Sequence, residues 1–215
     1  MVEEQGLFKT AIMQFQNTLT FAQELDSVDP LKNFRDKFII PEADGKQKIY
    51  FLGNSLGLQP KSTNGYIQQI MQDWAALGVE SFFHGKEPWM NYHDQWIHPL
   101  SKIVGALPHE LVVMNQLTVN LHLMLVSFYR PNANRYKIIC EAKAFPSDQY
   151  AFETHVIHHG VDSADAIVEV SPRQGEHCIR NEDILKAIQE NGESTALVLF
   201  SGINYYTGQL FDMAS

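Results

Sequence analysis

The sequence predicts an α/β fold with a mostly parallel sheet, preceded by N-terminal helical segments. Short apolar runs recur at 111–114, 137–140, 166–170 and 196–200, with a helical pattern between each run and the next. Strands that alternate with single helices are typical of βαβ units, in which the strands run parallel and the helices cover the sheet. With 45% hydrophobic and 19% charged residues, the 215-residue chain has the composition of an ordinary globular protein.

The helices expected between these strands span residues 118–129, 147–159 and 181–189. Glycine follows the second helix at Gly160 and lies beyond the third at Gly192. Glycine is common at such positions because it readily adopts the left-handed conformation that ends many helices. The pattern therefore places one helix after each of the first three strands.

Residues 1–100 have a less regular pattern. We expect two helical segments within about the first forty residues, a short strand at 49–52 and a helix at 62–77. A further helix is expected at 94–107, with a kink at Pro99. This first segment thus combines helices, one short strand and long loops.

Residues 101–215 are expected to hold only the first part of the α/β domain. The chain ends at Ser215, soon after the last apolar run. A parallel sheet normally needs helices on both faces and further strands beside them. We therefore expect the domain to be incomplete.

Charge and cysteine content disfavour several classes of protein. The chain has 16 basic and 25 acidic residues, and its net charge of −9 disfavours a nucleic-acid partner or an anionic membrane surface. No apolar stretch is long enough to span a bilayer, and Met1–Gly6 lacks the positive charge that begins a signal peptide. Cys140 and Cys178 form neither a C-x-x-C motif nor a disulfide framework. We expect a cytoplasmic protein with no membrane or nucleic-acid partner.

Three loops have the position at which ligands bind in a parallel α/β sheet, beyond the carboxyl ends of the strands. Residues 115–120 lead into a helix that Thr118 can cap, and N–H groups at such a helix start can bind an anion. Residues 143–148 contain Ser147 as the expected cap of the next helix. Residues 200–209 place two tyrosines between glycines. Plain helix caps and packed tyrosines would give the same pattern.

Two other patterns have a chemical interpretation that we do not favour. His155, His158 and His159 have a spacing that suits a metal, but no nearby cysteine or carboxylate completes the set, so we expect no metal and a solvated or helix-capping histidine face. Ser55 lies in a G-x-S-x-G string, but a nucleophile elbow needs a strand-to-helix turn, and Pro60 delays the helix.

Five blocks of sequence, taken in order, resemble the kynureninases, a pyridoxal-phosphate (PLP) family of the aspartate aminotransferase superfamily. The blocks are Tyr50–Pro60, Gly85–Trp89, Asn115–Asn120, Phe145–Asp148 and Phe200–Gln209. The resemblance runs from about Ala22 to Met213 and implies the N-terminal half of such an enzyme. It implies a fold-type-I PLP domain that begins within 101–215, with helices, a short strand and substrate-side loops in 1–100.

The resemblance also implies an activity. Kynureninases are PLP-dependent hydrolases of a carbon–carbon bond, which convert L-kynurenine or 3-hydroxykynurenine to anthranilate or 3-hydroxyanthranilate and L-alanine. The cofactor serves as the electron sink. The family acts in tryptophan catabolism and NAD biosynthesis, and its members are cytoplasmic homodimers whose active sites form at the subunit interface.

The resemblance assigns roles to residues that match the family's motifs. Leu117 and Thr118 are expected to bind the cofactor phosphate, and Phe145 to stack on its ring. Tyr206 is expected to reach the phosphate and assist proton transfer, which makes it the one catalytic candidate. The other expected positions are Pro146, Ser147, Asp148 and Ser201 at the cofactor, and Asn54 and Ser55 at the amino-acid end of the substrate.

Two catalytic motifs of the family do not occur in the chain. Neither an Asp-x-Ala-His motif, which supplies the aspartate at the pyridine nitrogen, nor a Ser-x-Lys motif, which supplies the Schiff-base lysine, is present, and Lys143 does not match the latter. We therefore expect the 215-residue chain alone to be inactive. The alternatives are another fold-type-I enzyme, such as a cysteine desulfurase or an aminotransferase, and a non-catalytic fragment or remnant.

Overall fold

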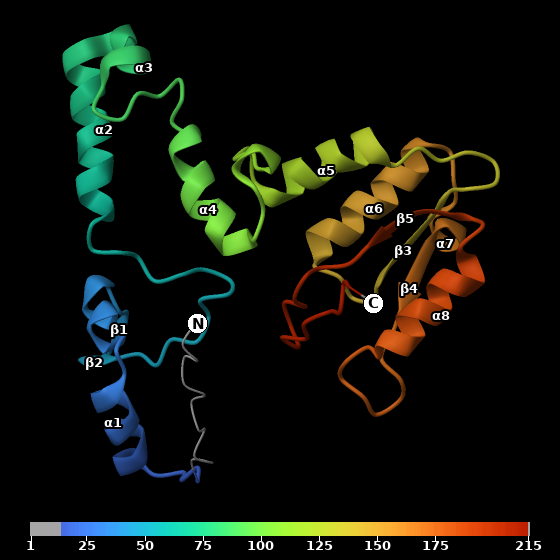
Figure 1. Ribbon diagram of the computed structural model, residues 1–215, viewed down its shortest axis with the longest axis horizontal. Helices are drawn as coiled ribbons and strands as arrows, with labels where there is room; N and C mark the ends of the chain where they lie inside the picture. Colours follow the sequence, from blue (N-terminus) through green and yellow to red (C-terminus); the bar gives the residue numbers. More distant parts are fainter. Residues whose placement is uncertain (1–13, 215) are drawn as a thin grey trace, which may run out of the picture. The chain divides into compact units, whose positions relative to one another are not determined.

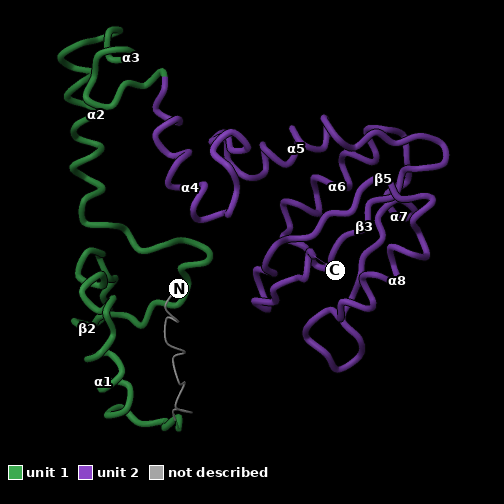
Figure 2. Tube along the Cα trace, viewed as in Figure 1, with its two compact units in different colours: residues 1–90 green, residues 91–215 purple. Residues whose placement is uncertain are grey.

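The computed structural model describes residues 14–214, which form two compact units that meet in the sequence between Met90 and Asn91 (Figure 2). The first thirteen residues, including the segment Met1–Gly6, and Ser215 lie outside the described residues. Among the described residues, no helix has both the length and the apolar character needed to cross a membrane.

The second unit contains the parallel sheet that the sequence predicts. Its strands are β3 (Lys137–Glu141), β4 (Ile167–Val170) and β5 (Thr195–Leu199), in the order β4-β3-β5 (Figure 1). Ile139 of the central strand pairs in parallel register with Val168 on one side and Val198 on the other. The predicted βαβ connections are therefore confirmed for these three strands.

Helices lie on both sides of this sheet (Figure 1). They are α5 (Leu117–Phe128), α6 (Pro146–His158), the short α7 (Ser163–Ala166) and α8 (Asn181–Asn191). The three longer helices confirm the predicted ones, with ends shifted by one or two residues, whereas α7 is an additional turn. Gly160, with φ 75°, follows the end of α6 as predicted.

The core has two layers because side chains alternate across a strand. Ile138 and Cys140 of β3 point to the face covered by α5 and α6, where they join a buried cluster that includes Phe152. Ile139 points to the opposite face and packs in a second cluster with Ile184 and other residues of α8. The central strand is thus buried on both faces, as its apolar run at 138–140 requires.

Two predicted strands are wrong. Residues 49–52 and 111–114 are apolar but are not assigned to any strand, and the described residues contain no strand paired with them. The side chains of Ile49, Phe51 and Val112 are exposed instead. An apolar run becomes a strand only where a neighbour satisfies its backbone N–H and C=O groups, which composition does not reveal.

The strands of the first unit form a small hairpin instead. β1 (Glu42–Ala43) pairs antiparallel with β2 (Lys46–Gln47). The two residues between them, Asp44 and Gly45, both have positive φ, at 52° and 70°. This conformation is that of a type I′ turn, for which Asp-Gly is a favoured sequence.

The helices of the first unit largely follow the prediction. α1 (Leu19–Val28) and the 3₁₀ helix η1 (Lys32–Lys37) account for the two early segments, and α2 (Thr63–Leu77) for the next. The 3₁₀ turn η2 (Gly78–Glu80) and the short α3 (Ser81–His84) follow α2.

The predicted helix at 94–107 consists of two pieces, and a third short turn follows it. They are the 3₁₀ turn η3 (Asp94–Trp96), α4 (Ile97–Val104) and the 3₁₀ turn η4 (Pro108–Glu110). Pro99 lies in the first turn of α4, where its missing N–H removes no helical bond. Gly105, with φ 71°, ends the helix earlier than predicted.

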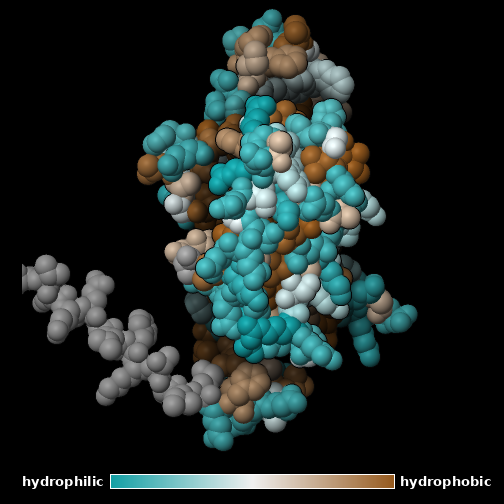
Figure 3. Space-filling model, turned by 90° about the vertical axis from the view of Figure 1, so that its right-hand side faces the viewer, coloured by the Kyte–Doolittle hydropathy of each residue, from teal (hydrophilic) through white to brown (hydrophobic). Residues whose placement is uncertain are grey.

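The surface turned to the viewer in Figure 3 is mostly hydrophilic, with separate hydrophobic residues between the polar ones. α8 illustrates the pattern, because Ile184 and Ile188 pack on the sheet while Glu182, Lys186 and Glu190 have exposed side chains. Such an amphipathic helix is typical of the outer layer of an α/β domain.

Candidate functional site

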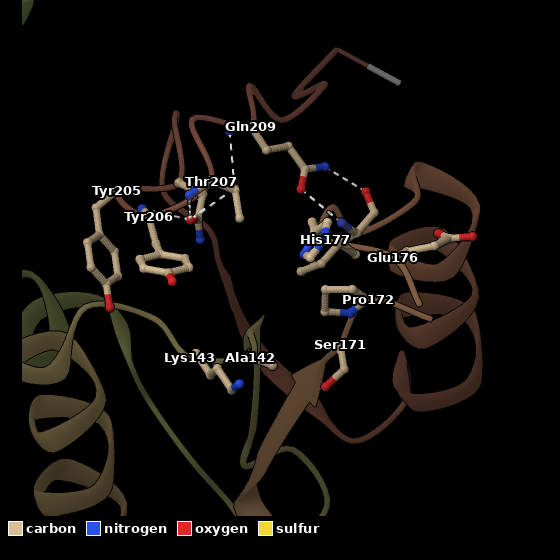
Figure 4. Close-up of a pocket in the computed structure, with 12 residues that line it drawn as sticks. Ala142, Lys143, Ser171, Pro172, Glu176, His177, Tyr205, Tyr206, Thr207 and Gln209 are labelled. Atoms are coloured by element: carbon tan, nitrogen blue, oxygen red, sulfur yellow. Dashed lines mark hydrogen bonds between the residues drawn. The ribbon is translucent and has the colours of Figure 1, made fainter. Parts of the chain in front are cut away.

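A pocket of about 510 Å³ lies beyond the carboxyl ends of the three parallel strands (Figure 4). Residues that follow β3 and β4 line it together with the loop after β5, which is the position that the sequence predicts for a ligand site. The residues are Ala142, Lys143, Ser171, Pro172, Glu176, His177, Ile179, Asn204, Tyr205, Tyr206, Thr207 and Gln209.

Both charge signs occur at this pocket. Lys143 follows β3 with φ 56°, a left-handed conformation that few residues other than glycine adopt. Glu176 lies on the β4 side, and the hydrogen bond from the Arg180 guanidinium, 2.9 Å between Nε and Oε2, holds the pKa of that carboxyl below its ordinary value. The carboxyl group is therefore ionised over a wider pH range than an isolated one.

The loop after β5 is fixed by its own side chains. The Oδ1 atom of Asn204 accepts hydrogen bonds from the backbone N–H groups of Tyr206 at 3.0 Å and Thr207 at 2.9 Å. Gln209 forms two bonds with the backbone of Ile179, donating to its carbonyl at 2.6 Å and accepting from its N–H at 2.8 Å (Figure 4). The tyrosines are therefore carried by an ordered turn.

A buried carboxyl group lies beneath this loop. Glu141, the last residue of β3, is only 4% exposed. It accepts hydrogen bonds from the backbone N–H of Ser201 at 3.3 Å, from the Ser201 hydroxyl, and from the side-chain amide of Asn204 at 2.7 Å. The sequence prediction missed Glu141. An acidic residue directly after the apolar run 138–140 was the available signal.

Aromatic surfaces lie at the edge of the same region. Phe145 and Tyr205 form an edge-to-face pair with ring centroids 5.0 Å apart. Phe145 remains 49% exposed and Tyr206 86% exposed. Figure 4 shows both tyrosine side chains extending from the loop toward Lys143 and Ala142. These rings are available to a planar ligand.

The starts of α5 and α6 differ from the prediction. α5 begins at Leu117, one residue before Thr118, and α6 begins at Pro146, one residue before Ser147, so neither predicted cap residue precedes its helix. Neither helix start has a side-chain cap hydrogen bond. Proline has no N–H and a suitable fixed φ, which explains why α6 begins with it.

The two helices begin on the same side of the unit. The ring of His122 lies 5.8 Å from that of His155, and the ring of Tyr129 lies 5.5 Å from that of His159. Later residues of one helix thus lie beside later residues of the other, so α5 and α6 run in the same direction. Their N-termini therefore share an end, which Figure 1 shows on the side where the loop after β5 lies. The positive ends of two helix dipoles face this side.

Comparison with curated proteins finds several kynureninases that are similar to this chain, whereas no protein-family model matches it. A kynureninase of Flavobacterium psychrophilum is 60% identical over 201 residues, which are 94% of this chain and 47% of that protein. One of Myxococcus xanthus is 50% identical over 202 residues, and one of Rattus norvegicus is 45% identical over 204 residues, with 94% and 89% of this chain covered. The chain is kynureninase-like over nearly its whole length. It spans about half the length of these curated relatives.

The predicted site residues of the second unit lie in the loops after β3 and β5 and at the starts of α5 and α6, and among them Tyr206 alone lines the pocket. Ser201 is bonded to Glu141, and Tyr206 lines the pocket. Phe145 contacts Tyr205, which is a pocket residue. The remaining predicted cofactor residues stand at the helix starts: Leu117 and Thr118 on α5, and Pro146, Ser147 and Asp148 on α6.

Asp148 lies in the first turn of α6, where a carboxylate is stabilised by the helix dipole. The Ser147 hydroxyl donates a hydrogen bond to the Oδ1 atom of Asp148 at 3.2 Å. The backbone N–H of Asp148 donates to the Phe145 carbonyl at 2.8 Å. These bonds hold Asp148 beside Phe145. The kynureninase-like motif at the start of α6 is thus a compact unit.

Asn54 and Ser55 belong to the first unit. The Ser55 N–H donates to the Leu52 carbonyl at 2.9 Å within a short turn, and both Asn54 and Ser55 are exposed. The apolar residues directly before this turn form no strand, and α2 begins only at Thr63. The turn therefore lacks the strand-to-helix geometry of a nucleophile elbow.

The Gly85–Trp89 block is anchored to α2 through one carboxylate. The Oδ2 atom of Asp73 accepts the backbone N–H of Lys86 at 2.9 Å, and the Asp73 carbonyl accepts the Ser81 hydroxyl at 2.9 Å. A Cβ atom at Gly85 would lie 3.1 Å from that Oδ2 atom. The glycine thus allows the block to approach the carboxylate closely.

The histidines of α6 do not form a metal site. Within residues 14–214, no group of three or more His, Cys, Asp or Glu side chains is placed to hold a metal. The predicted solvated face holds for His158 and His159 but is wrong for His155, which is 7% exposed because α5 covers it. Burial is also the main cause that lowers the pKa of His155.

Proposed function

We propose that the complete protein is a kynureninase, which hydrolyses L-kynurenine or its 3-hydroxy form to anthranilate or 3-hydroxyanthranilate and L-alanine. The observation that carries this proposal is the 60% identity to a curated kynureninase across 94% of this chain. The strand-end pocket, with its ordered tyrosine loop, supports the proposal independently of that identity.

The starts of α5 and α6, together with the loop after β5, offer groups that suit pyridoxal phosphate. The start of α5 has no side-chain cap, so its first-turn N–H groups are suited to a phosphate. The half-exposed ring of Phe145 offers a surface for a planar heterocycle. We assign phosphate binding to Leu117 and Thr118 and ring stacking to Phe145. The lining of the cofactor site is assigned to Pro146, Ser147, Asp148 and Ser201.

Pyridoxal phosphate, when bound, withdraws electrons from the substrate so that a carbon–carbon bond can break. The residues of this chain bind, orient and move protons around that chemistry. We assign proton transfer to the phenol oxygen of Tyr206, whose backbone N–H is fixed by Asn204. An ordered turn fixes the backbone of Tyr206, and its side chain remains open to a ligand. Asn54 and Ser55 are assigned to the amino-acid end of the substrate.

Several broader assignments follow from the same proposal. Residues 1–100 supply the N-terminal helices and substrate-side loops, and residues 101–215 the first part of a fold-type-I PLP domain. A homodimer, a cytoplasmic location and a role in NAD biosynthesis as well as tryptophan catabolism are predictions from the family. The parallel sheet and its strand-end site support the domain assignment.

A substrate panel tests this proposal. The complete protein, supplied with pyridoxal phosphate, is incubated separately with L-kynurenine, 3-hydroxykynurenine, L-cysteine, and L-alanine with a 2-oxo acid. We expect an aromatic amine product from one or both kynurenines and no sulfide or transamination product. Sulfide release or amino-group transfer without hydrolysis of either kynurenine would assign the protein to another reaction. Tyr206→Phe is expected to lower turnover by about 100-fold or more, because positioned general acid–base groups contribute that much.

A further inference from the structure

We propose that Glu141 is a positioning residue, which fixes the loop that carries Ser201 and Tyr206. Its consequence for turnover rests on the proposed function, whereas its effect on the loop does not. The proposal begins from a buried acidic side chain that the cofactor assignment leaves unused.

Three hydrogen-bond donors converge on the Glu141 carboxyl group. Oε1 accepts the Ser201 N–H at 3.3 Å and the Ser201 hydroxyl, and Oε2 accepts the Asn204 amide at 2.7 Å. A carboxylate accepts at both oxygens, so it can receive both N–H donors and the Ser201 hydroxyl at once. These bonds connect the end of β3 to residues 60 and 63 positions later in the chain.

Asn204 transmits this constraint to the tyrosine. Because its Nδ2 atom is bonded to Glu141, its Oδ1 atom points to the other side, where it accepts the N–H groups of Tyr206 at 3.0 Å and Thr207 at 2.9 Å. Oδ1 also accepts the Thr207 hydroxyl at 3.1 Å. The orientation of one side-chain amide therefore links the buried carboxylate to the backbone of Tyr206.

The hydrogen bond from Asn204 to Glu141 can be tested by substitutions that exchange its donor and its acceptor. In Glu141→Gln, the side chain has one accepting oxygen where the carboxylate had two, so either the Ser201 N–H or the Asn204 amide loses its acceptor, although the Ser201 hydroxyl can turn to accept. Turning Asn204 over only transfers the mismatch to Tyr206 and Thr207. In Asn204→Asp, two carboxyl groups face each other. In the double variant, the introduced glutamine can donate to the introduced aspartate and accept from Ser201, while the second oxygen of that aspartate still accepts both backbone N–H groups. Every bond is restored with the same net charge.

The experiment measures amide hydrogen exchange across residues 201–209 in the complete protein, for the wild type, both single variants and the double variant. We expect the Tyr206 and Thr207 amides to exchange at least about 10-fold faster in each single variant, since each loses an acceptor held in place. The double variant is expected to return to within about threefold of the wild type. Glu169→Gln is the matched control, because it makes the same acid-to-amide change on the neighbouring strand. Glu169 pairs with Cys140 of β3, and its carboxyl group accepts a hydrogen bond from Gln149 of α6.

Turnover gives the second readout. We expect kcat to fall about 10-fold in the single variants and to recover in the double variant, with KM for kynurenine changed less, because the loop positions a proton-transfer group. Single variants that exchange like the wild type, or a double variant no better than the worse single one, would overturn the positioning role. Exchange that follows the cycle in a protein without kynurenine hydrolysis would refute the proposed function and leave the positioning role intact.

Discussion

Phe145, directly before α6, and Phe152, in the middle of that helix, provide a matched pair of substitutions. Phe152 is fully buried between α6 and the sheet, whereas Phe145 is 49% exposed at the edge of the pocket. A buried phenylalanine removes about 200 Å² from water, and Phe→Ala at such a site costs about 3–5 kcal/mol because a cavity remains. Phe145 buries about half of that area and leaves no closed cavity, so we expect a cost of about 1–2 kcal/mol.

The order is predicted to be reversed for cofactor binding, where Phe145→Ala has the larger effect. Phe145→Ala removes the ring proposed to stack on the cofactor, which lowers pyridoxal-phosphate affinity by about 10-fold, equivalent to about 1.4 kcal/mol. Phe145→Tyr keeps a ring and is the control. Urea unfolding followed by circular dichroism gives the stability of the complete protein, and a pyridoxal-phosphate titration gives the affinity. Equal stability losses, or an affinity that Phe145→Ala leaves unchanged, would refute this reasoning.

Three further predictions concern single residues. Burial raises the pKa of the Cys140 thiol to about 12, whereas Cys178 is exposed, so alkylation at pH 8 followed by peptide mapping should label Cys178 and leave Cys140 unlabelled until unfolding. Because the pKa of His155 is lowered, the folded state binds fewer protons than the unfolded state just below pH 6.5, and stability is lost as the pH falls through that window. His155→Phe should reduce this loss of stability in unfolding titrations from pH 7 to pH 5. Gly85→Ala should destabilise the block after α3 by about 1 kcal/mol, because its Cβ would crowd the Asp73 carboxylate at 3.1 Å, whereas Gly53→Ala, with no atom within 4 Å, should change little in the same urea experiment.

The three-stranded sheet could be predicted because helical segments of the sequence connect its apolar runs. The runs that became β3, β4 and β5 are each connected by a helical segment, and a βαβ connection itself implies a parallel partner. Residues 49–52 are equally apolar but lack such a connection, and they form no strand; residues 111–114 form none either, although α5 connects them to β3. Apolar content alone does not determine whether a neighbouring strand is present.

The candidate site could be predicted only in part for a related reason. Its position beyond the strand ends follows from the fold class, and Tyr206 lies there as expected. Glu141 could not be predicted, because its importance comes from Ser201 and Asn204, which are 60 and 63 residues away in the chain. The buried position of His155 likewise depends on coverage by α5, a contact that helical spacing within α6 does not contain.

The measurement that tests the central claim most directly is the product balance of the complete protein with L-kynurenine. The protein is saturated with pyridoxal phosphate, and anthranilate and L-alanine are quantified in the same samples over time. A kynureninase produces the two in a one-to-one ratio, with the rate reduced strongly in Tyr206→Phe. L-Kynurenine and 3-hydroxykynurenine that both remain unconsumed by the cofactor-loaded protein, or alanine formed without the aromatic amine, would contradict the account.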